Sequence, residues 1–274
     1  MTINCKGQLI DVTSPKVMGI LNITPDSFYD GGKHKLEKNL LKHVEQMLLE
    51  GATFIDVGAY SSKPNASHVS ENEELLRILP VVKCVLKEFP ETLISIDTFR
   101  SEVAKACIEN GAALINDISA GMLDKNMLQT IADLHVPYIM MHMRGTPQTM
   151  QQQTSYDNLV KDILFYFSER IATARALDII DLIVDPGFGF AKTVKQNYKL
   201  LNQLELFNML ELPLLVGMSR KSMIYKTLET SPEEALNGTS VLNTIALQKG
   251  ANILRVHDVK EAMECIKLVQ SLNL

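Results

Sequence analysis

The segment from residue 17 to residue 57 decides the fold. It opens with the apolar run Val17-Met-Gly-Ile-Leu21, continues through Leu36–Glu50, and ends with Thr53-Phe-Ile-Asp-Val57. The two outer runs are continuously apolar, which is typical of parallel strands buried on both faces. The middle segment repeats its apolar residues every three or four positions, and it stops at Gly51 because glycine accepts the left-handed conformation that follows a helix. The segment therefore predicts one strand–helix–strand unit.

The same unit recurs along the whole chain, with helical patterns at Ser101–Asn110 and Thr239–Lys249 that also stop at a glycine. Eight apolar runs without a linker predict a single α/β domain over residues 1–274, a closed (β/α)₈ TIM barrel. An open doubly wound sheet is the alternative, and the count of eight disfavours it. The segment before Val17 is expected to form a short β-hairpin or plug across the barrel bottom. The predicted strands are Val17–Leu21, Thr53–Val57, Leu93–Ile96, Ala113–Ile115, Tyr138–Met141, Leu182–Val184, Leu214–Val216 and Asn252–Leu254.

Composition narrows the class of protein. The chain has 274 residues, 46% of them hydrophobic, and a net charge of −5 that argues against nucleic-acid binding. No stretch approaches the roughly 18 apolar residues of a membrane span, and the N-terminus lacks the apolar core of a secretion signal. The cysteines show no CxxC spacing, so we expect reduced packing residues in a cytoplasmic protein and no zinc cage. They are Cys5, Cys84, Cys107 and Cys265.

Polar residues stand at the carboxyl ends of the predicted strands. In a barrel the catalytic groups come from the ends of several strands, so these residues are expected to converge on one mouth. Any one of these residues could simply cap a loop. Capping does not account for polar residues at the ends of all eight strands, because buried Asp, Asn and Lys need partners or a ligand. In chain order they are Asn22, Asp56, Asp97, Asn116-Asp117, His142, Asp185, the group Gly217, Ser219, Arg220 and Lys221, and the pair Arg255 and His257.

The residue types suggest a ligand. Asp97, Asn116 and Asp185 supply acceptors and an amide, and Lys221 supplies a donor. That set suits a flat heterocycle with amide-like edges, such as an amino-pyrimidinone, whose N–H groups meet a carboxylate and whose carbonyl meets a lysine.

A second group of residues suits an anion. Arg255 and His257 lie two residues apart after one strand, and with Lys63 they favour a phosphate or diphosphate. The amide oxygen of Asn22 suits a hard cation such as Mg²⁺, which bridges phosphate oxygens. The sequence contains no Ser-His-Asp order, HExxH or Walker motif, so the site is expected to bind and orient rather than attack covalently.

Two loops are long for a barrel, residues 22–35 and residues 58–70, and both are rich in turn formers. This favours lids that cover a substrate over ordinary surface loops. The aromatic residues Phe28 and Tyr29 on the first, otherwise polar loop also favour a lid.

Motifs from Val17 to the C-terminus resemble the dihydropteroate synthase family of the folate pathway. Each stands at the end of an expected strand, and so many in order are highly specific. They are Gly19-Ile-Leu-Asn-Ile-Thr-Pro-Asp-Ser-Phe28 with Asp30-Gly-Gly32, Ile96-Asp-Thr98, Ile115-Asn-Asp-Ile-Ser-Ala-Gly121, Met141-His-Met143 with Gly145-Thr-Pro147, Asp185-Pro-Gly-Phe-Gly-Phe190, Gly217-Met-Ser-Arg-Lys-Ser222, Asn237-Gly-Thr239 and Arg255-Val-His257.

The resemblance implies a transferase that condenses a dihydropterin methyl diphosphate with 4-aminobenzoate. It implies a dissociative route in which diphosphate leaves before the amine attacks, a Mg²⁺ ion on Asn22, a cytoplasmic homodimer and sensitivity to sulfonamides. Asp97, Asp185 and Lys221 take the catalytic roles. The implied pterin site is Asp97, Asn116, Met141, Asp185, Phe190, Gly217, Lys221 and Arg255. The implied diphosphate site is Asn22, Ser62, Lys63, Arg255 and His257, and the aminobenzoate site is Phe28, Ser62, Pro64, Phe190 and Ser222.

The second loop departs from the family pattern. It reads Gly58-Ala-Tyr-Ser-Ser-Lys-Pro-Asn65, where the family usually has Gly-Gly-Glu-Ser-Thr-Arg-Pro-Gly. Lys63 in place of arginine keeps the charge and loses the bidentate fork. Two alternative functions share the pterin-binding barrel, a corrinoid-dependent methyltetrahydrofolate methyltransferase and a non-catalytic pterin-binding homologue. The first-loop motif and the Arg255-Val-His257 motif favour the synthase over both.

Overall fold

The computed structural model describes residues 1–23, 33–60 and 69–272, with the side chains of residues 33–36 left out. Eight parallel strands form one sheet in the order β8-β7-β6-β5-β4-β3-β10-β9. The edge strands meet through a single bridge between Val184 and Leu214, and Val184 N donates to Pro213 O at 3.0 Å. The sheet is therefore a nearly closed barrel, as predicted. Its strands are β3 (Lys16–Asn22), β4 (Phe54–Gly58), β5 (Leu93–Asp97), β6 (Leu114–Asp117), β7 (Tyr138–Met141), β8 (Leu182–Asp185), β9 (Leu215–Val216) and β10 (Ile253–Val256).

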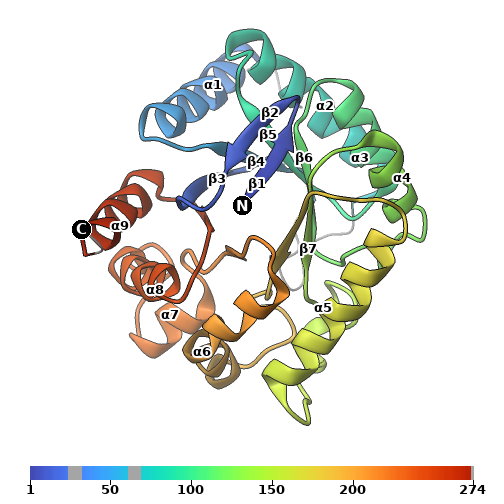
Figure 1. Cartoon of the computed structure of the whole chain (residues 1–274). Coiled ribbons are helices and arrows are strands. Elements are labelled where there is room, and N and C mark those ends of the chain that lie inside the picture. Colours follow the sequence, from blue (N-terminus) through green and yellow to red (C-terminus); the bar gives the residue numbers. More distant parts are fainter. Residues whose placement is uncertain (24–32, 61–68, 273–274) are drawn as a thin grey trace.

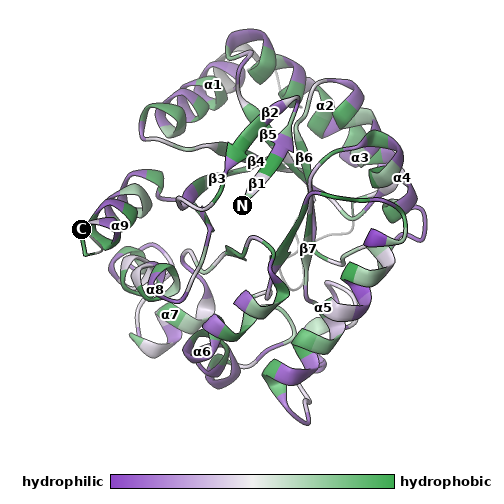
Figure 2. Cartoon of the chain, in the orientation of Figure 1, coloured by the Kyte–Doolittle hydropathy of each residue, from purple (hydrophilic) through white to green (hydrophobic). Residues whose placement is uncertain are grey.

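Helices surround this barrel (Figure 1), and their hydrophobic residues alternate with hydrophilic ones along each helix (Figure 2). Glycines end α1 and α3, since Gly51 and Gly111 have φ values of +105° and +97°. The helices are α1 (Lys33–Leu49), α2 (Glu71–Glu88), α3 (Ser101–Glu109), α4 (Met127–Leu134), α5 (Leu159–Arg175), α6 (Val194–Asn202), α7 (Ser222–Thr227), α8 (Leu236–Gln248) and α9 (Val259–Ser271). Short 3₁₀ turns are η2 (Met150–Gln152) and η3 (Leu204–Leu210).

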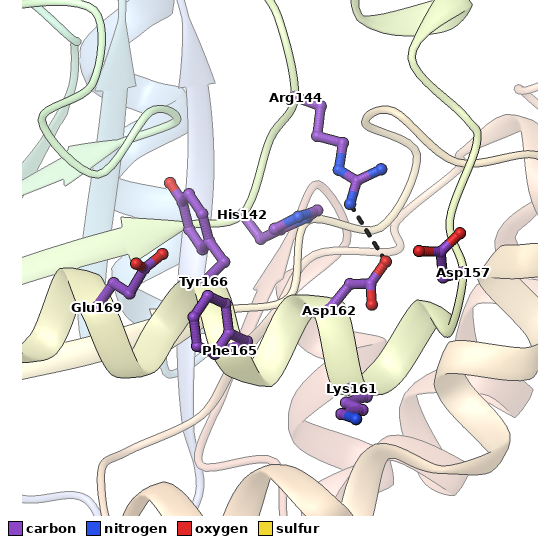
Figure 3. Close-up of a pocket in the computed structure, with 8 residues that line it drawn as sticks. All are labelled: His142, Arg144, Asp157, Lys161, Asp162, Phe165, Tyr166 and Glu169. Atoms are coloured by element: carbon purple, nitrogen blue, oxygen red, sulfur yellow. Dashed lines mark hydrogen bonds and ion pairs between the residues drawn. The ribbon is translucent and has the colours of Figure 1, made fainter.

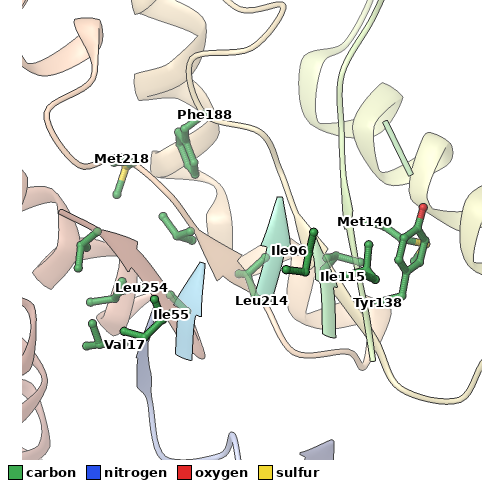
Figure 4. Packing of buried hydrophobic residues seen from close by; sticks show 14 of the residues in the cluster. Val17, Ile55, Ile96, Ile115, Tyr138, Met140, Phe188, Leu214, Met218 and Leu254 are labelled. Carbon is green, nitrogen blue, oxygen red and sulfur yellow. The ribbon is translucent and has the colours of Figure 1, made fainter. Parts of the chain in front are cut away.

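The main core lies between the barrel strands and the helices. Alternate strand residues such as Val17, Ile55, Ile96 and Leu254 point into it, and Figure 4 shows this packing from close by. Continuous burial along the strands explains why their sequences are apolar without alternation.

The opening segment forms the expected hairpin. Strands β1 (Thr2–Cys5) and β2 (Gln8–Asp11) pair antiparallel, and the hairpin lies across the ring of strands in Figure 1. Ile3 and Cys5 are buried in a second core with residues from the amino ends of the strands, including Met18 and Phe54. The hairpin therefore closes the bottom of the barrel, and the opposite end is left for the polar residues.

The cysteines and the helices bear on two further expectations. All four cysteines are free, and Cys5, Cys107 and Cys265 are buried as expected for packing residues, whereas Cys84 is only partly buried. Within the described residues, no helix is long and apolar enough to cross a membrane.

Candidate active site

The centre of the mouth is a hydrogen-bond network around the Arg255 guanidinium. Its Nε donates to Asp56 Oδ2 at 2.6 Å, and its Nη2 donates to Asp97 Oδ2 at 2.7 Å. Asn116 Nδ2 donates to the same Asp56 oxygen at 3.2 Å. These four residues come from β10, β4, β5 and β6, so four strands meet in one polar network.

Burial sets the charge state of this network. It raises the pKa of Asp97 to about 7, with the Arg255 charge opposing the rise and the nearby Asp56 carboxylate adding to it. Burial would lower the pKa of Arg255, but Asp56 and Asp97 outweigh it and the guanidinium stays charged. Asp56 Oδ1 is buried without a hydrogen-bond partner among the described residues. The network therefore has acceptor capacity in reserve for a ligand with N–H groups.

A carboxylate and an ammonium face each other on the other side of the mouth. Asp185, buried at the end of β8, accepts from Gly187 N at 2.8 Å through Oδ1. Lys221 Nζ donates to Phe188 O at 2.6 Å and lies 4.7 Å from the centre of the Phe190 ring. Burial raises the pKa of Asp185 and lowers that of Lys221 to about 8, and in each case the charge of the other residue opposes the shift. The pair offers one anionic and one cationic contact to a ligand.

Apolar residues lie beside these charges. Met141 and the partly buried Phe190 belong to one cluster after β7 and β8. Gly217, after β9, lies against Arg255, since a Cβ built there would stand 3.7 Å from Arg255 Cβ. These surfaces suit the faces of a flat ring whose edges meet the polar network.

The rim carries the residues predicted for an anion. Asn22 is exposed as the last residue of β3, where it pairs with Gly58, which in turn lies against the Asp97 side chain. His257 is exposed after β10, with Nδ1 2.9 Å from Ser219 Oγ. Ser222 begins α7 directly after Lys221. Arg255 uses two of its five N–H groups in the bonds to Asp56 and Asp97, which leaves others for an anion.

Four predicted site residues lie outside the described residues, in segments 24–32 and 61–68. They are Phe28, Ser62, Lys63 and Pro64, and their roles stay predictions. In the described part of the chain, no group of three His, Cys, Asp or Glu side chains could hold a metal ion. The exposed Asn22 offers an amide oxygen at the rim, a type of ligand that Mg²⁺ accepts.

Three polar residues at the strand ends do not face the mouth, which corrects the expectation that all of them converge. Asp117 is the acceptor for Tyr138 Oη at 2.6 Å and for the amides of Ser119 and Gly121, so it holds the turn after β6. Arg220 forms a bidentate pair with Asp258, at 2.9 Å and 2.8 Å.

His142 is the third of these residues. It lies beside Tyr166 and Arg144 next to α5 and lines a pocket of about 500 Å³ there (Figure 3). Its ring packs edge-on against Tyr166 with a centroid distance of 4.9 Å. Successive residues along a strand direction point to opposite faces. Met141 therefore points toward the mouth, and His142, the next residue, points toward α5.

Two residues of the site were not assigned a role from the sequence. Asp56 joins Arg255 to Asn116 through hydrogen bonds. A carboxylate inside an otherwise apolar strand is the sequence feature that could have indicated this role. Lys192 is buried behind the Asp185–Phe190 turn and bonds to its carbonyls. A lysine two residues after a Gly- and Phe-rich turn is the sequence signal that could have identified it.

Comparison with known proteins gives a consistent result. A family profile described as pterin binding enzyme matches residues 18–257. The chain is 44% identical to the dihydropteroate synthase of Escherichia coli K12 over 273 residues, which is 99% of this chain and 96% of the relative. It is 40% identical to the Bacillus subtilis dihydropteroate synthase, over 93% of this chain and 88% of the relative.

Solved structures show the same similarity. A Yersinia pestis dihydropteroate synthase in complex with a sulfonamide drug superposes with a TM-score of 0.92 at 42% identity, over 100% of this chain and 99% of that one. A Xanthomonas albilineans dihydropteroate synthase with 4-aminobenzoic acid gives a TM-score of 0.91 at 36% identity, over 99% and 98%.

Proposed function

The chain belongs to the family of pterin binding enzymes, and we infer from this membership and from its barrel mouth that it is a dihydropteroate synthase. It condenses a dihydropterin methyl diphosphate with 4-aminobenzoate to give dihydropteroate and diphosphate, a transferase reaction of folate biosynthesis. The observation that carries this inference is the mouth itself, where the Asp97–Arg255–Asp56–Asn116 network faces the Asp185–Lys221 pair.

For the pterin, we propose edge recognition by the polar residues and stacking by the apolar ones. Asp97 and Asp185 accept from ring N–H and NH₂ groups, Asn116 offers an amide, and Lys221 donates to the ring carbonyl. Met141, Phe190, Gly217 and the Arg255 side chain line the faces. Ligand N–H donors would stabilise both carboxylates in the ionised form that burial disfavours.

For the leaving group, we propose that Asn22, Arg255 and His257 hold the diphosphate together with Ser62 and Lys63. Asn22 would also bind a Mg²⁺ ion that enters together with the diphosphate, and the ion would neutralise charge on the departing oxygens. The exposed positions of Asn22 and His257 at the rim support this assignment.

For the second substrate, the described residues Phe190 and Ser222 would shape the aminobenzoate pocket with Phe28, Ser62 and Pro64. The relative solved with 4-aminobenzoic acid and the relative solved with a sulfonamide support a pocket that takes both compounds. We therefore expect sulfonamides to compete with 4-aminobenzoate for this enzyme.

We propose a dissociative mechanism. The bond between the exocyclic methylene carbon and the diphosphate oxygen breaks first, and the electron pair leaves with the oxygen. The resulting pterin cation is stabilised by the Asp97 and Asp185 carboxylates, whose negative charge lies where positive charge develops. The aromatic amine nitrogen then donates its electron pair to the carbon and releases its proton to solvent.

The activity is tested by an assay for diphosphate release from the purified protein. Product must form with both substrates and Mg²⁺ present, and formation of dihydropteroate should follow by chromatography. Methyl transfer from methyltetrahydrofolate, or pterin binding without turnover, would instead indicate one of the alternative functions.

The order of bond breaking is tested in a single turnover at high enzyme concentration. With the pterin diphosphate alone, diphosphate should be released slowly without any aminobenzoate. Strict dependence of all diphosphate release on the amine would contradict the dissociative route.

We also propose a homodimer in the cytoplasm. Leu206 and Met209 on η3, Leu228 after α7 and Val241 on α8 are exposed apolar side chains. Their elements are neighbours, since Lys249, directly after α8, pairs with Glu205 in η3, and Leu228 lies against Gly238 of α8. Such a group suits a subunit interface. Val241→Glu should give monomers in sedimentation, whereas Leu268→Glu, at an exposed side chain of α9, should not. Three buried thiols fit a reducing compartment, and cell fractionation tests the location.

A further inference from the structure

The turn Asp185–Phe190 carries two of the residues proposed to bind the pterin, one at each end. Its conformation is unusual at Gly187, where φ is +71° and a Cβ would lie only 2.2 Å from His142 O. The turn therefore lies directly on the backbone after β7, and any side chain at residue 187 would push it away. The conformation of so closely packed a turn depends on the groups that bond to its carbonyls.

Lys192 supplies that contact from behind the turn. Its side chain is 4% exposed, and Nζ lies 3.0 Å from Gly187 O, 3.0 Å from Phe190 O and 3.1 Å from His142 Nδ1. An ammonium has three protons and no acceptor, and these three atoms are all acceptors when the imidazole proton is on Nε2. The charged form of Lys192 is therefore fully hydrogen-bonded.

The electrostatic surroundings agree with this assignment of protons. Burial lowers the pKa of His142 well below its usual value, with the charge of Lys192 adding to the effect, so the ring is neutral and can accept. Burial also lowers the pKa of Lys192 to about 7, while Asp185 opposes the shift and the Lys221 and Arg144 charges add to it. The ammonium thus depends on its three acceptors and on Asp185.

Gly187 links this ammonium to the pterin contact. Its N–H donates to Asp185 Oδ1 at 2.8 Å, and its carbonyl accepts from Lys192 at 3.0 Å. On the mouth side, Lys221 Nζ donates to Phe188 O at 2.6 Å. The ammonium groups of Lys192 and Lys221 therefore bond to carbonyls of the same turn, and that of Lys221 also lies 4.7 Å from the centre of the Phe190 ring.

We propose that Lys192, hydrogen-bonded to the His142 ring nitrogen, is a positioning residue for the pterin site. Its ammonium fixes the carbonyls of the turn so that the Asp185 carboxylate and the Phe190 ring stand ready for the pterin. This role rests on the proposed function, but it concerns a residue that does not itself touch the substrate.

The test measures binding of an oxidised pterin, 6-hydroxymethylpterin, by calorimetry to Lys192→Met and to the matched control Lys195→Met. Lys195 is exposed and lies three residues after Lys192, in the first turn of α6, so its variant should bind as the wild type does. Lys192→Met keeps the stem and leaves the carbonyls unpaired, and we expect the Kd to rise by about tenfold or more. The KM for the pterin diphosphate should rise as well.

A purely structural role predicts a different result. Lys192→Met would then melt at a lower temperature, but the folded protein would bind the pterin with wild-type Kd, and that outcome would overturn the proposal. Failure of the wild type to bind the pterin would instead count against the proposed function. The two failures are therefore distinguishable.

A double-mutant cycle tests whether the lysine and the ring act as a unit. His142→Phe removes one acceptor and should raise the Kd less than Lys192→Met does. The double variant should bind no more weakly than Lys192→Met alone, because the ring acts through the ammonium. Lys192→Arg, which retains a charged donor, should recover part of the affinity. If Lys192→Met does not fold, wild-type Kd in both His142→Phe and Lys192→Arg would overturn the proposal.

Discussion

At the scale of single residues, the mouth and the turn beside it carry partly or fully buried charges whose pKa values have moved toward neutrality. Burial raises the pKa of Asp97 to about 7 and lowers those of Lys192 and Lys221 to about 7 and 8. Each group is therefore close to changing its charge at physiological pH, and a ligand that bonds to the charged form fixes that form. Such shifts are common where a protein binds or transforms a substrate.

These pKa values predict a pH dependence of pterin binding. Asp97 offers a charged acceptor to the pterin only when ionised, above about pH 7, and Lys221 offers a charged donor only below about pH 8. The value of kcat/KM for the pterin diphosphate should therefore rise as pH increases through 7 and fall as pH increases through 8. Lys192 adds to the alkaline fall.

The measurement is a pH–rate profile at fixed ionic strength. In Asp97→Asn the acidic limb should disappear from the activity that remains, since the amide does not titrate. A profile that stays flat from pH 6 to 9 in the wild type would show that neither residue's charge matters for pterin capture.

The Asp185 carboxylate gives a second prediction at this scale. Asp185→Asn keeps the size of the side chain, and the amide oxygen can still accept from Gly187 N. The amide NH₂ then faces the pterin donors, and one charge-assisted hydrogen bond is lost, about 1.5–3 kcal/mol. Calorimetry with 6-hydroxymethylpterin should show this loss with little change in melting temperature. Unchanged affinity would remove Asp185 from the site.

The types of residue at the mouth could be predicted from sequence, but their partners could not. Asp97, Asn116, Asp185 and Lys221 follow strands, and the fold brings them to one end. The link from Arg255 to Asp56 spans 199 positions, and no local pattern signals it. His142 was misplaced because the face to which a residue at a strand end points depends on where the pleat stops.

At the scale of elements, the strand pattern was informative because each strand is buried on both faces. Predicted and observed strands differ by a residue or two at their ends, and β9 is shortened to Leu215–Val216. Helix α8 begins at Leu236, three residues before the predicted start, because its first turn lacks a capping side chain that would mark it. Helix beginnings without caps are hard to place from sequence.

A buried ion pair between elements gives a further prediction. Arg100, before α3, pairs with Glu74 of α2 and donates to Val69 O at 2.6 Å, and its guanidinium lies over the Phe99 ring. Arg100→Ala leaves the fully buried Glu74 without its cation, which should lower the free energy of unfolding by about 3–5 kcal/mol. Urea titration measures it.

The matched control is Lys249→Ala, which breaks a pair with the half-exposed Glu205. Exposed pairs contribute about 0–1 kcal/mol, so this variant should unfold close to the wild type. Equal losses in the two variants would mean that burial of the Glu74–Arg100 pair carries no special weight.

At the scale of the whole molecule, the two ends of the barrel have separate tasks. The hairpin and the amino ends of the strands form an apolar core, while the carboxyl ends carry the charges. Asn252 ties the two parts of the lower end together, since its Nδ2 donates to Val12 O at 2.9 Å and its Oδ1 accepts from Leu214 N at 2.9 Å. This follows the division in barrel enzymes between a stabilising face and a catalytic face.

The last prediction uses this separation. Ile3, 1% exposed in the hairpin, packs in the lower core with Met18 and Phe54. Ile3→Ala should therefore lower the free energy of unfolding by about 2–5 kcal/mol, through lost burial and the cavity left behind. Leu9→Ala, at a side chain that is 73% exposed on the same hairpin, should have little effect. Because the hairpin covers the end of the barrel opposite the charged mouth, the folded Ile3→Ala protein should bind 6-hydroxymethylpterin with wild-type Kd. The Kd is measured without denaturant, at a temperature where the variant is fully folded. A raised Kd under these conditions would show that the lower core also sets the geometry of the pterin site.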